Sequence, residues 1–244
     1  SLTREAVLAR QLLGGGRAEA DHDSLLCALA HDGVPVHWCE GYLAPDTYLF
    51  AEGSGPEVVA SVLLQTKLAR LDSLASGAGV LNDQVDALRA AAGQVDGLDL
   101  GRVAIRGWSF GGYLAALAVM RRPDVFHTAI AGAPVTEWRL YDTHYTERYL
   151  GDPGEQPEVY DASSLLPLAD RLERPLLLIH GLADDNVVAA HSLRLSAALL
   201  AAGKGHEVLP LVGVTHMTSQ EVVAEHLLLH QLDFLRRSLP VRSA

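Results

Sequence analysis

Cysteine is scarce in this 244-residue chain, and no apolar run reaches the length of a membrane-spanning helix. The two cysteines, Cys27 and Cys39, match neither a CxxC motif nor a paired metal signature. This pattern favours two reduced thiols, and a disulfide between them stays open. The first residues also lack the basic and apolar regions of a signal peptide, so we expect a cytoplasmic protein with no membrane partner.

Basic residues are few relative to acidic ones, 19 against 30, which gives a formal net charge of −11. Nucleic acid and anionic membranes would repel such a chain at long range, so neither is an expected partner. The sequence has no phosphate-binding glycine loop and no dinucleotide fingerprint, and we expect no cofactor. Whether the chain forms a homo-oligomer stays open. A hydrophobic content of 49% indicates a globular chain, long enough for one α/β domain with a substantial core.

Short apolar strands alternate with longer helices from residue 80 onward. The expected strands are 102–106, 127–135, 175–180 and 206–212, and the expected helices are 80–92, 110–121, 189–202 and 219–238. Such alternation favours parallel pairing with helices on both faces. The sequence therefore predicts an α/β fold with a doubly wound, mostly parallel sheet.

Residues 1–79 are harder to interpret. Helices are expected at 2–13 and 21–30, and an edge strand at 34–39, because Pro35 cannot donate to a ladder. Residues 48–64 fit either a hairpin or a strand followed by a helix that Pro56 opens. We treat 1–79 as an N-terminal segment of uncertain fold and 80–244 as the α/β region.

A glycine-rich turn, Gly107-Trp108-Ser109-Phe110-Gly111-Gly112, lies where an expected strand ends and an expected helix begins. Only residues without a side chain tolerate such a turn, which explains the glycines on both sides of Ser109. This geometry raises the serine hydroxyl above the sheet edge and directs the Phe110 N–H at the place where an oxyanion would form. The alternative is a serine that merely caps the helix.

Two other strand ends carry possible partners for this serine. Asp184 and Asp185 follow the strand at 175–180, and His216 follows the strand at 206–212. A serine hydroxyl needs an imidazole to take its proton, and a carboxylate behind the imidazole holds its tautomer. Serine, acid, histidine is also the chain order of α/β-hydrolases. The alternatives are a histidine bonded to backbone and an aspartate pair that forms a turn or a helix cap.

Three stretches resemble the catalytic domain of the prolyl oligopeptidase family, nearest its dipeptidyl peptidase IV branch: 107–113, 138–149 and 180–187. The similarity covers roughly residues 81–239. It implies an α/β-hydrolase fold in which Ser109 is the nucleophile, Asp184 rather than Asp185 the acid, and His216 the base. The implied activity is that of a serine peptidase that cleaves short peptides after proline or alanine through an acyl-enzyme.

The resemblance also implies an apolar slot for the residue before the scissile bond. Its positions here are Val135, Trp138, Tyr141, Tyr145 and Val187, with Asn186 as a polar contact to substrate. A flat proline ring gains from burial against aromatic faces and offers no N–H to hydrogen-bond. Taken alone, the three aromatic residues fit ordinary core packing equally well.

The chain departs from the family in its first half. Residues 1–79 contain no Tyr-Gly-Gly-Pro-like motif, which in the family supplies the second oxyanion donor, and no recognisable strands that precede the nucleophile strand. The β-propeller that covers the site in the family does not fit within 244 residues, and Met217 stands where many members have glycine. We therefore expect an incomplete first half, as in a fragment, a gene fusion or a weakened enzyme.

These departures leave two alternatives open: a small-ester or amide hydrolase, and a non-catalytic remnant. A metal site is not expected. His226 and His230 lie four residues apart, but no third ligand is evident, which favours an ordinary helix face.

Overall fold

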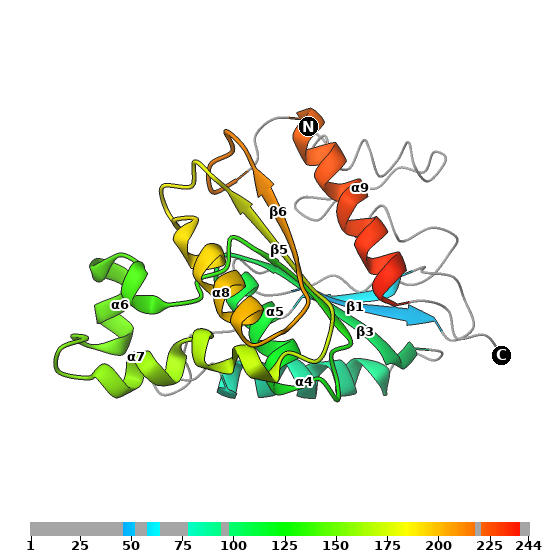
Figure 1. Cartoon of the computed structure of the whole chain (residues 1–244). Coiled ribbons are helices and arrows are strands. Elements are labelled where there is room, and N and C mark those ends of the chain that lie inside the picture. Colours follow the sequence, from blue (N-terminus) through cyan, green and yellow to red (C-terminus); the bar gives the residue numbers. More distant parts are fainter. Residues whose placement is uncertain (1–45, 52–57, 64–77, 94–97, 218–220, 240–244) are drawn as a thin grey trace, which may run out of the picture.

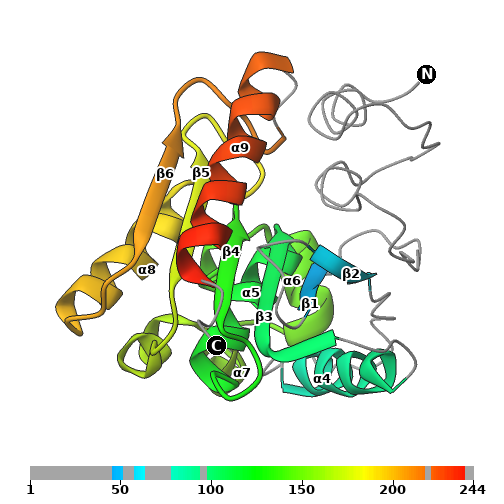
Figure 2. The same cartoon turned by 90° about the vertical axis from the view of Figure 1, so that its right-hand side faces the viewer.

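A computed structural model of the chain describes residues 46–51, 58–63, 78–93, 98–217 and 221–239. These residues form a six-stranded sheet in the order β2-β1-β3-β4-β5-β6, which Figure 2 shows from one edge to the other. Its strands are β1 (Asp46–Ala51), β2 (Val58–Leu63), β3 (Leu98–Trp108), β4 (Thr128–Gly132), β5 (Leu176–Gly181) and β6 (Glu207–Leu211). Strands β3 to β6 are parallel, whereas β1 is antiparallel to both of its neighbours. The predicted α/β fold with a mostly parallel sheet is confirmed.

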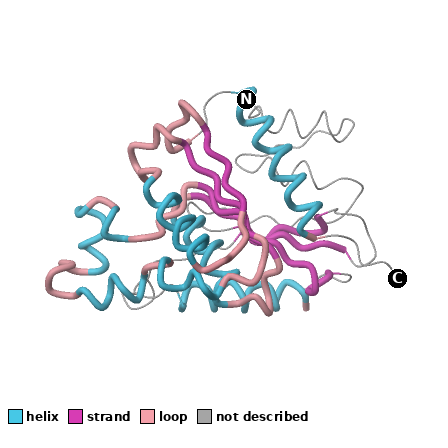
Figure 3. Tube along the Cα trace, viewed as in Figure 1, coloured by secondary structure: helices cyan, strands magenta, loops and turns pink. Residues whose placement is uncertain are grey.

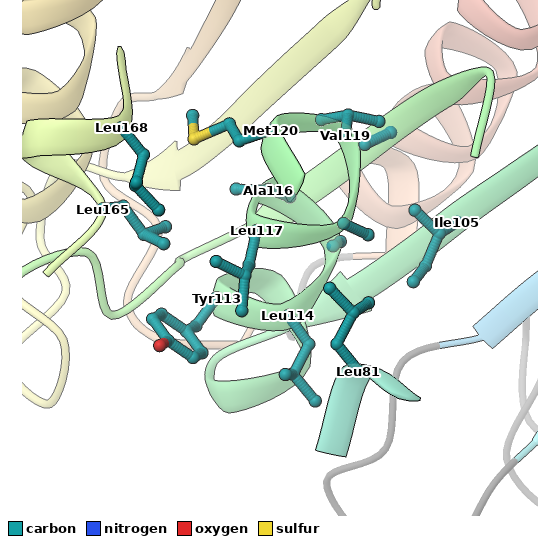
Figure 4. Close-up of a cluster of buried hydrophobic side chains, with 14 of the residues drawn as sticks. Leu81, Ile105, Tyr113, Leu114, Ala116, Leu117, Val119, Met120, Leu165 and Leu168 are labelled. Atoms are coloured by element: carbon teal, nitrogen blue, oxygen red, sulfur yellow. The ribbon is translucent and has the colours of Figure 1, made fainter. Parts of the chain in front are cut away.

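Helices cover both faces of the sheet (Figure 1). The helices that pack on it are α4 (Ala78–Ala92), α5 (Phe110–Arg121), α8 (Ala190–Ala201) and α9 (Glu221–Ser238). Successive strand residues point to opposite faces. Leu177 and Ile179 of β5 accordingly pack in the cluster with α9, whereas Leu176 and Leu178 belong to the larger cluster that contains α4, α5 and α8. Part of the larger cluster, centred on α5, is drawn in Figure 4.

The chain between β4 and β5 forms an excursion to one side of the sheet. It contains η1 (Trp138–Leu140), α6 (Thr143–Leu150), α7 (Pro157–Ser163) and η2 (Leu166–Arg171). Figure 1 shows α6 and α7 projecting away from the strands. Because it begins just after the carboxyl end of β4, this excursion lies at the edge of the sheet where ligands of α/β folds bind.

Most element bounds agree with the expected ranges, and α5 spans the predicted 110–121. Strand β4 is shorter than the predicted 127–135, because Ala133 takes a positive φ of 39° and Pro134 follows it. Strand β6 contains Pro210, which has no N–H for a ladder. This is tolerated because β6 pairs only with β5 and forms the edge of the sheet.

Two strands that were not recognisable in the sequence as family elements precede the nucleophile strand. Residues 46–51 and 58–63 form a hairpin, which is the first of the two arrangements predicted for that segment. Strand β1 also pairs directly with β3, with Asp46 opposite Arg106. The register shifts between Leu49 and Phe50 in both pairings, and such a bulge breaks the alternation by which a strand is identified. The helices expected at 2–13 and 21–30, the strand at 34–39 and both cysteines lie outside the described residues, and the boundary at 79/80 stays a prediction.

None of the helices in the described part of the chain is long and apolar enough to cross a membrane.

Candidate active site

Ser109 lies on the corner between β3 and α5 with strained backbone angles, φ 58° and ψ −118°. Its amide donates to the Gly132 carbonyl at 2.9 Å, which ties the turn to the end of the neighbouring strand. The side chain makes no capping hydrogen bond to α5, so the helix-cap alternative is wrong. A Cβ on Gly107 would collide with the Gly111 carbonyl, so the turn closes only with glycine at this position.

Phe110 is the first residue of α5, so its N–H has no acceptor within the helix. Its ring packs against Tyr113 and Trp138, with ring centroids 5.8 and 6.1 Å away. The aromatic contacts hold the start of α5 against the excursion, beside the turn that carries Ser109. A free N–H at a helix start is suited to bind a developing negative charge.

Asp184 is a buried carboxylate that accepts three hydrogen bonds. Its Oδ1 accepts from the amides of Asn186 at 3.0 Å and Val187 at 2.9 Å, and its Oδ2 accepts from His216 Nδ1 at 2.8 Å. The side chain is 0% exposed, whereas Asp185 is exposed. The turn alternative and the acid role are therefore compatible, because one oxygen closes the turn and the other holds the imidazole.

The loops that follow β5 and β6 are bonded to each other, and Figure 3 shows them together at one end of the sheet. The Leu182 amide donates to the Leu211 carbonyl at 2.9 Å, and the Ala183 amide donates to the Val214 carbonyl at 3.0 Å. A Cβ on Gly181 would collide with the Val214 and Thr215 carbonyls. This close approach brings the loop that carries His216 onto the loop that carries Asp184.

His216 contacts both of the other strand ends. Its Nδ1 bonds Asp184, and its carbonyl accepts from the indole Nε1 of Trp108 at 2.8 Å, one residue before Ser109. Because an ionised carboxylate only accepts, Nδ1 carries the proton and Nε2 keeps its lone pair. The imidazole is 19% exposed, so Nε2 remains accessible to a reacting group. The sequence analysis did not identify Trp108, whose only signal is its place before the serine of the motif.

The aromatic residues expected to line a substrate slot lie together. The Trp138 and Tyr145 rings are nearly parallel, 17° apart with centroids separated by 6.4 Å, and Tyr141 stands almost perpendicular to both. The Tyr141 hydroxyl donates to Asn186 Oδ1 at 3.0 Å, which joins the excursion to the acid loop. Val135 and Val187 are buried in the same cluster. A small cavity at this place is lined by Trp138, Tyr145, Thr146, Tyr149 and Leu150.

Burial affects the titratable groups of the slot. It raises the pKa of both Tyr141 and Tyr145, so their hydroxyls stay neutral at ordinary pH. Tyr149, whose ring centroid lies 4.9 Å from that of Tyr145, extends the aromatic wall and was not predicted. The slot is therefore apolar and uncharged.

His180 is a second histidine beside Asp184, and sequence reasoning missed it. Its Nε2 donates to the Val187 carbonyl at 2.7 Å and lies 3.5 Å from Asp184 Oδ2, while Nδ1 bonds the Ser192 hydroxyl at 2.7 Å. Burial lowers the pKa of this imidazole and favours its neutral form. Its position near the carboxyl end of β5, next to Gly181, was the available signal.

Among the described residues, no group of three or more His, Cys, Asp or Glu side chains is arranged to hold a metal ion.

Comparison with known proteins gives the family context. The Prolyl oligopeptidase family pattern matches residues 70–241. Dipeptidyl peptidase 8 of Mus musculus is 42% identical over 167 residues, which are 67% of this chain and 19% of that protein. Dipeptidyl peptidase 4 of Sus scrofa is 36% identical over 165 residues, 66% of this chain and 21% of that protein. The solved structure of Porphyromonas gingivalis dipeptidyl peptidase 4 matches 65% of this chain and 22% of its own, with a TM-score of 0.61 and 34% identity. The chain thus spans about a fifth of the length of the curated relatives named here.

Proposed function

The chain belongs to the prolyl oligopeptidase family of serine peptidases, and from that premise we propose that it cleaves short peptides after proline or alanine through an acyl-enzyme on Ser109. The observation that carries the proposal is the 2.8 Å bond between His216 Nδ1 and buried Asp184, in a loop that also bonds Trp108 beside Ser109. Few structural roles would require a strained serine, a buried carboxylate and a histidine after β3, β5 and β6, at the same edge of one sheet.

The role of each catalytic residue in the proposed reaction follows from the proton that it gives, takes or holds. His216 Nε2 takes the proton of the Ser109 hydroxyl as the oxygen attacks the substrate carbonyl, and it later returns that proton to the leaving amine. Asp184 holds the productive tautomer and stabilises the imidazolium that forms. Water then attacks the carbonyl of the acyl-enzyme while His216 takes its proton. The bond to Ser109 Oγ breaks, and His216 returns the proton to that oxygen.

The oxyanion that forms during attack meets the Phe110 N–H at the start of α5. In the family, a tyrosine from the first half supplies a second donor, and no matching motif is present in residues 1–79. Loss of one donor typically costs about a hundred- to a thousand-fold in turnover. We therefore propose a peptidase with low turnover when this chain acts by itself.

The side chain before the scissile bond enters the aromatic slot, where it contacts the cluster of Trp138, Tyr141 and Tyr145 rings. Tyr141 and Asn186, joined by their hydrogen bond, mark the rim where polar backbone of the substrate passes. An apolar slot of this kind fits proline and alanine and disfavours charged side chains, which would lose hydration without a partner.

Covalent labelling by a fluorophosphonate tests the proposal, because this reagent reacts only with an activated serine. We expect the wild type and Ser196→Ala to be labelled and Ser109→Ala to stay unlabelled. Ser196 is a matched control: its hydroxyl bonds His206 Nε2 at 2.7 Å, yet it lies within α8 without a strained turn. Equal absence of label from wild type and Ser109→Ala would favour the non-catalytic remnant.

Hydrolysis of small esters is the second candidate, favoured because residues 1–79 carry no Tyr-Gly-Gly-Pro-like motif that would add a second oxyanion donor to the Phe110 N–H. An ester has a better leaving group than an amide and needs less stabilisation of the oxyanion. A proline anilide and a nitrophenyl ester separate the two candidates. Turnover of the anilide that is lost in Ser109→Ala supports the peptidase, and ester turnover without any anilide turnover supports the alternative.

A further inference from the structure

The two parallel walls of the aromatic slot stand on different elements. Trp138 belongs to η1, and Tyr145 belongs to α6. Only Tyr141 and Asp142 join these elements in sequence, and α6 projects from the sheet together with α7 (Figure 1). The separation of the two rings therefore depends on what holds the excursion against η1.

Arg139, the residue after Trp138, makes that connection. One guanidinium nitrogen, Nη2, donates to the Pro157 carbonyl at 2.9 Å and pairs with Asp161 at 2.8 Å. The other, Nη1, lies 3.4 Å from Glu137, whose carboxylate also accepts from the Arg139 amide at 3.2 Å. One side chain thus binds the first residue of α7, a carboxylate in the middle of that helix, and the residue that precedes η1.

Tyr160 extends the connection to the far end of α6. Its ring lies beneath Arg139, with the guanidinium carbon 5.3 Å from the ring centroid. Its hydroxyl donates to the Gly151 carbonyl at 2.7 Å, and the Gly151 amide caps the end of α6 by donating to Glu147. The ring is 1% exposed, so this link is fixed by packing as well as by hydrogen bonds. Helix α6 is therefore joined to η1 by the chain at its start, and its end is bonded by Tyr160, whose ring packs against Arg139.

We propose that Arg139 is a positioning residue that sets the spacing of the Trp138 and Tyr145 rings, and through it the preference for proline over alanine. The proposal rests on the proposed function, because it concerns the substrate slot of that reaction. Arg139 acts from behind the slot: its described partners lie in α7 and at residue 137. A proline ring is wide enough to contact the edges of both the Trp138 and Tyr145 rings, whereas an alanine methyl reaches little of the second ring. Loosening the excursion should therefore affect proline substrates selectively.

The test compares Arg139→Met with Arg237→Met. Arg237 is a matched control on α9: it pairs with Asp233 at 2.8 Å and Glu207 at 2.9 Å, and it lies 5.8 Å from the Phe234 ring centroid. For each variant, kcat and KM are measured on Ala-Pro-anilide and Ala-Ala-anilide. We expect Arg139→Met to lower kcat/KM about tenfold for proline, mainly through KM, and by less than about twofold for alanine. Arg237→Met should leave the proline-to-alanine ratio unchanged.

Two further variants separate positioning from general stability. Asp161→Asn removes one anchor of Arg139 at an exposed carboxylate, and we expect it to lower the same ratio by about two- to threefold without loss of folding. Arg139→Lys keeps one charged contact and should restore part of the proline-to-alanine ratio lost in Arg139→Met.

The inference is overturned if the wild type is active and both Arg139→Met and Asp161→Asn keep the wild-type ratio. If the wild type hydrolyses neither anilide, the proposed function fails first, so the two failures are distinguishable.

Discussion

A single carboxylate, Asp184, serves two structural purposes in the candidate site. Its Oδ1 closes the turn through the amides of Asn186 and Val187, and its Oδ2 orients His216. The Val187 amide donates to Asp184, and the Val187 carbonyl accepts from His180 Nε2. The acid, the buried histidine and the slot residue Val187 therefore move as one unit. Sequence pattern alone offered turn and acid as alternatives, because it does not show that the two oxygens of one side chain are used separately.

His191 provides a prediction about stability at low pH. It is fully buried, and its Nδ1 accepts from the Thr136 amide at 3.2 Å, so the neutral form with the proton on Nε2 is the folded one. Burial lowers its pKa to about 4, with smaller contributions from His180 and Arg194. Between the unfolded value and this one, the unfolded chain binds one more proton, so the free energy of unfolding falls as pH falls. The loss is about 3 kcal/mol once pH reaches the folded pKa.

Urea unfolding of wild type and His191→Asn, followed from pH 7 to pH 4.5, measures this effect. Asparagine keeps an acceptor near the Nδ1 position and does not titrate. We expect the free energy of unfolding of the wild type to fall by about 2 to 3 kcal/mol more than that of the variant over this range. Other titrating groups, His180 among them, are common to both chains and cancel. Parallel pH profiles would contradict the assignment of the shift to His191.

At the scale of elements, the site depends on how closely two loops approach. A Cβ on Gly181 would collide with the Val214 and Thr215 carbonyls, just before His216. We expect Gly181→Ala to displace the base and lower kcat by about a hundredfold or more, since misplacement of a catalytic group by about 1 Å has that cost.

Gly205→Ala is the control for this substitution, because a Cβ there meets nothing within 4 Å and the residue does not have a positive φ. It should keep wild-type kcat. The measurement is kcat on the proline anilide together with the melting temperature of each variant. Wild-type activity in a folded Gly181→Ala protein would show that the approach of the loops is not needed.

The elements that sequence predicted well are those with a strong local signal. Helix α5 carries eleven successive residues that are buried, and its start is marked by the glycines around Ser109. The strand before it and the strand ends with Asp184 and His216 were found for the same reason. Strands β1 and β2 were predicted only as one of two arrangements of residues 48–64, because the shift in register between Leu49 and Phe50 breaks the alternation that identifies a strand.

The contacts that complete the site were beyond sequence reasoning for a different reason. These contacts join residues that are far apart in the chain or lie on separate elements. Trp108 bonds the His216 carbonyl, His180 bonds the Val187 carbonyl, and Arg139 bonds the Pro157 carbonyl of α7. Each partner is a backbone carbonyl, which is present at every residue and so carries no sequence signal. Residue identity could suggest which side chains perform chemistry, but not which peptide groups hold them.

At the scale of the whole molecule, one continuous sheet supports the site from β2 to β6. The chain spans about a fifth of the length of the curated relatives named above, yet it brings together the strand ends with serine, acid and histidine. The hairpin of β1 and β2 extends the sheet beyond β3 on the side opposite to β4.

The overall charge of −11 should also influence which substrates reach the site. A negative field attracts peptides with a free, cationic amino terminus and has no such effect on acetylated, neutral ones. We expect kcat/KM for free Ala-Pro-anilide to fall about threefold when salt rises from about 20 to about 500 mM, because salt screens this attraction. N-acetyl-Ala-Pro-anilide shares the reacting bond and serves as the control, with little change expected. Equal salt dependence of both substrates would mean that salt acts on the enzyme itself, and the long-range field would then play no part in substrate capture.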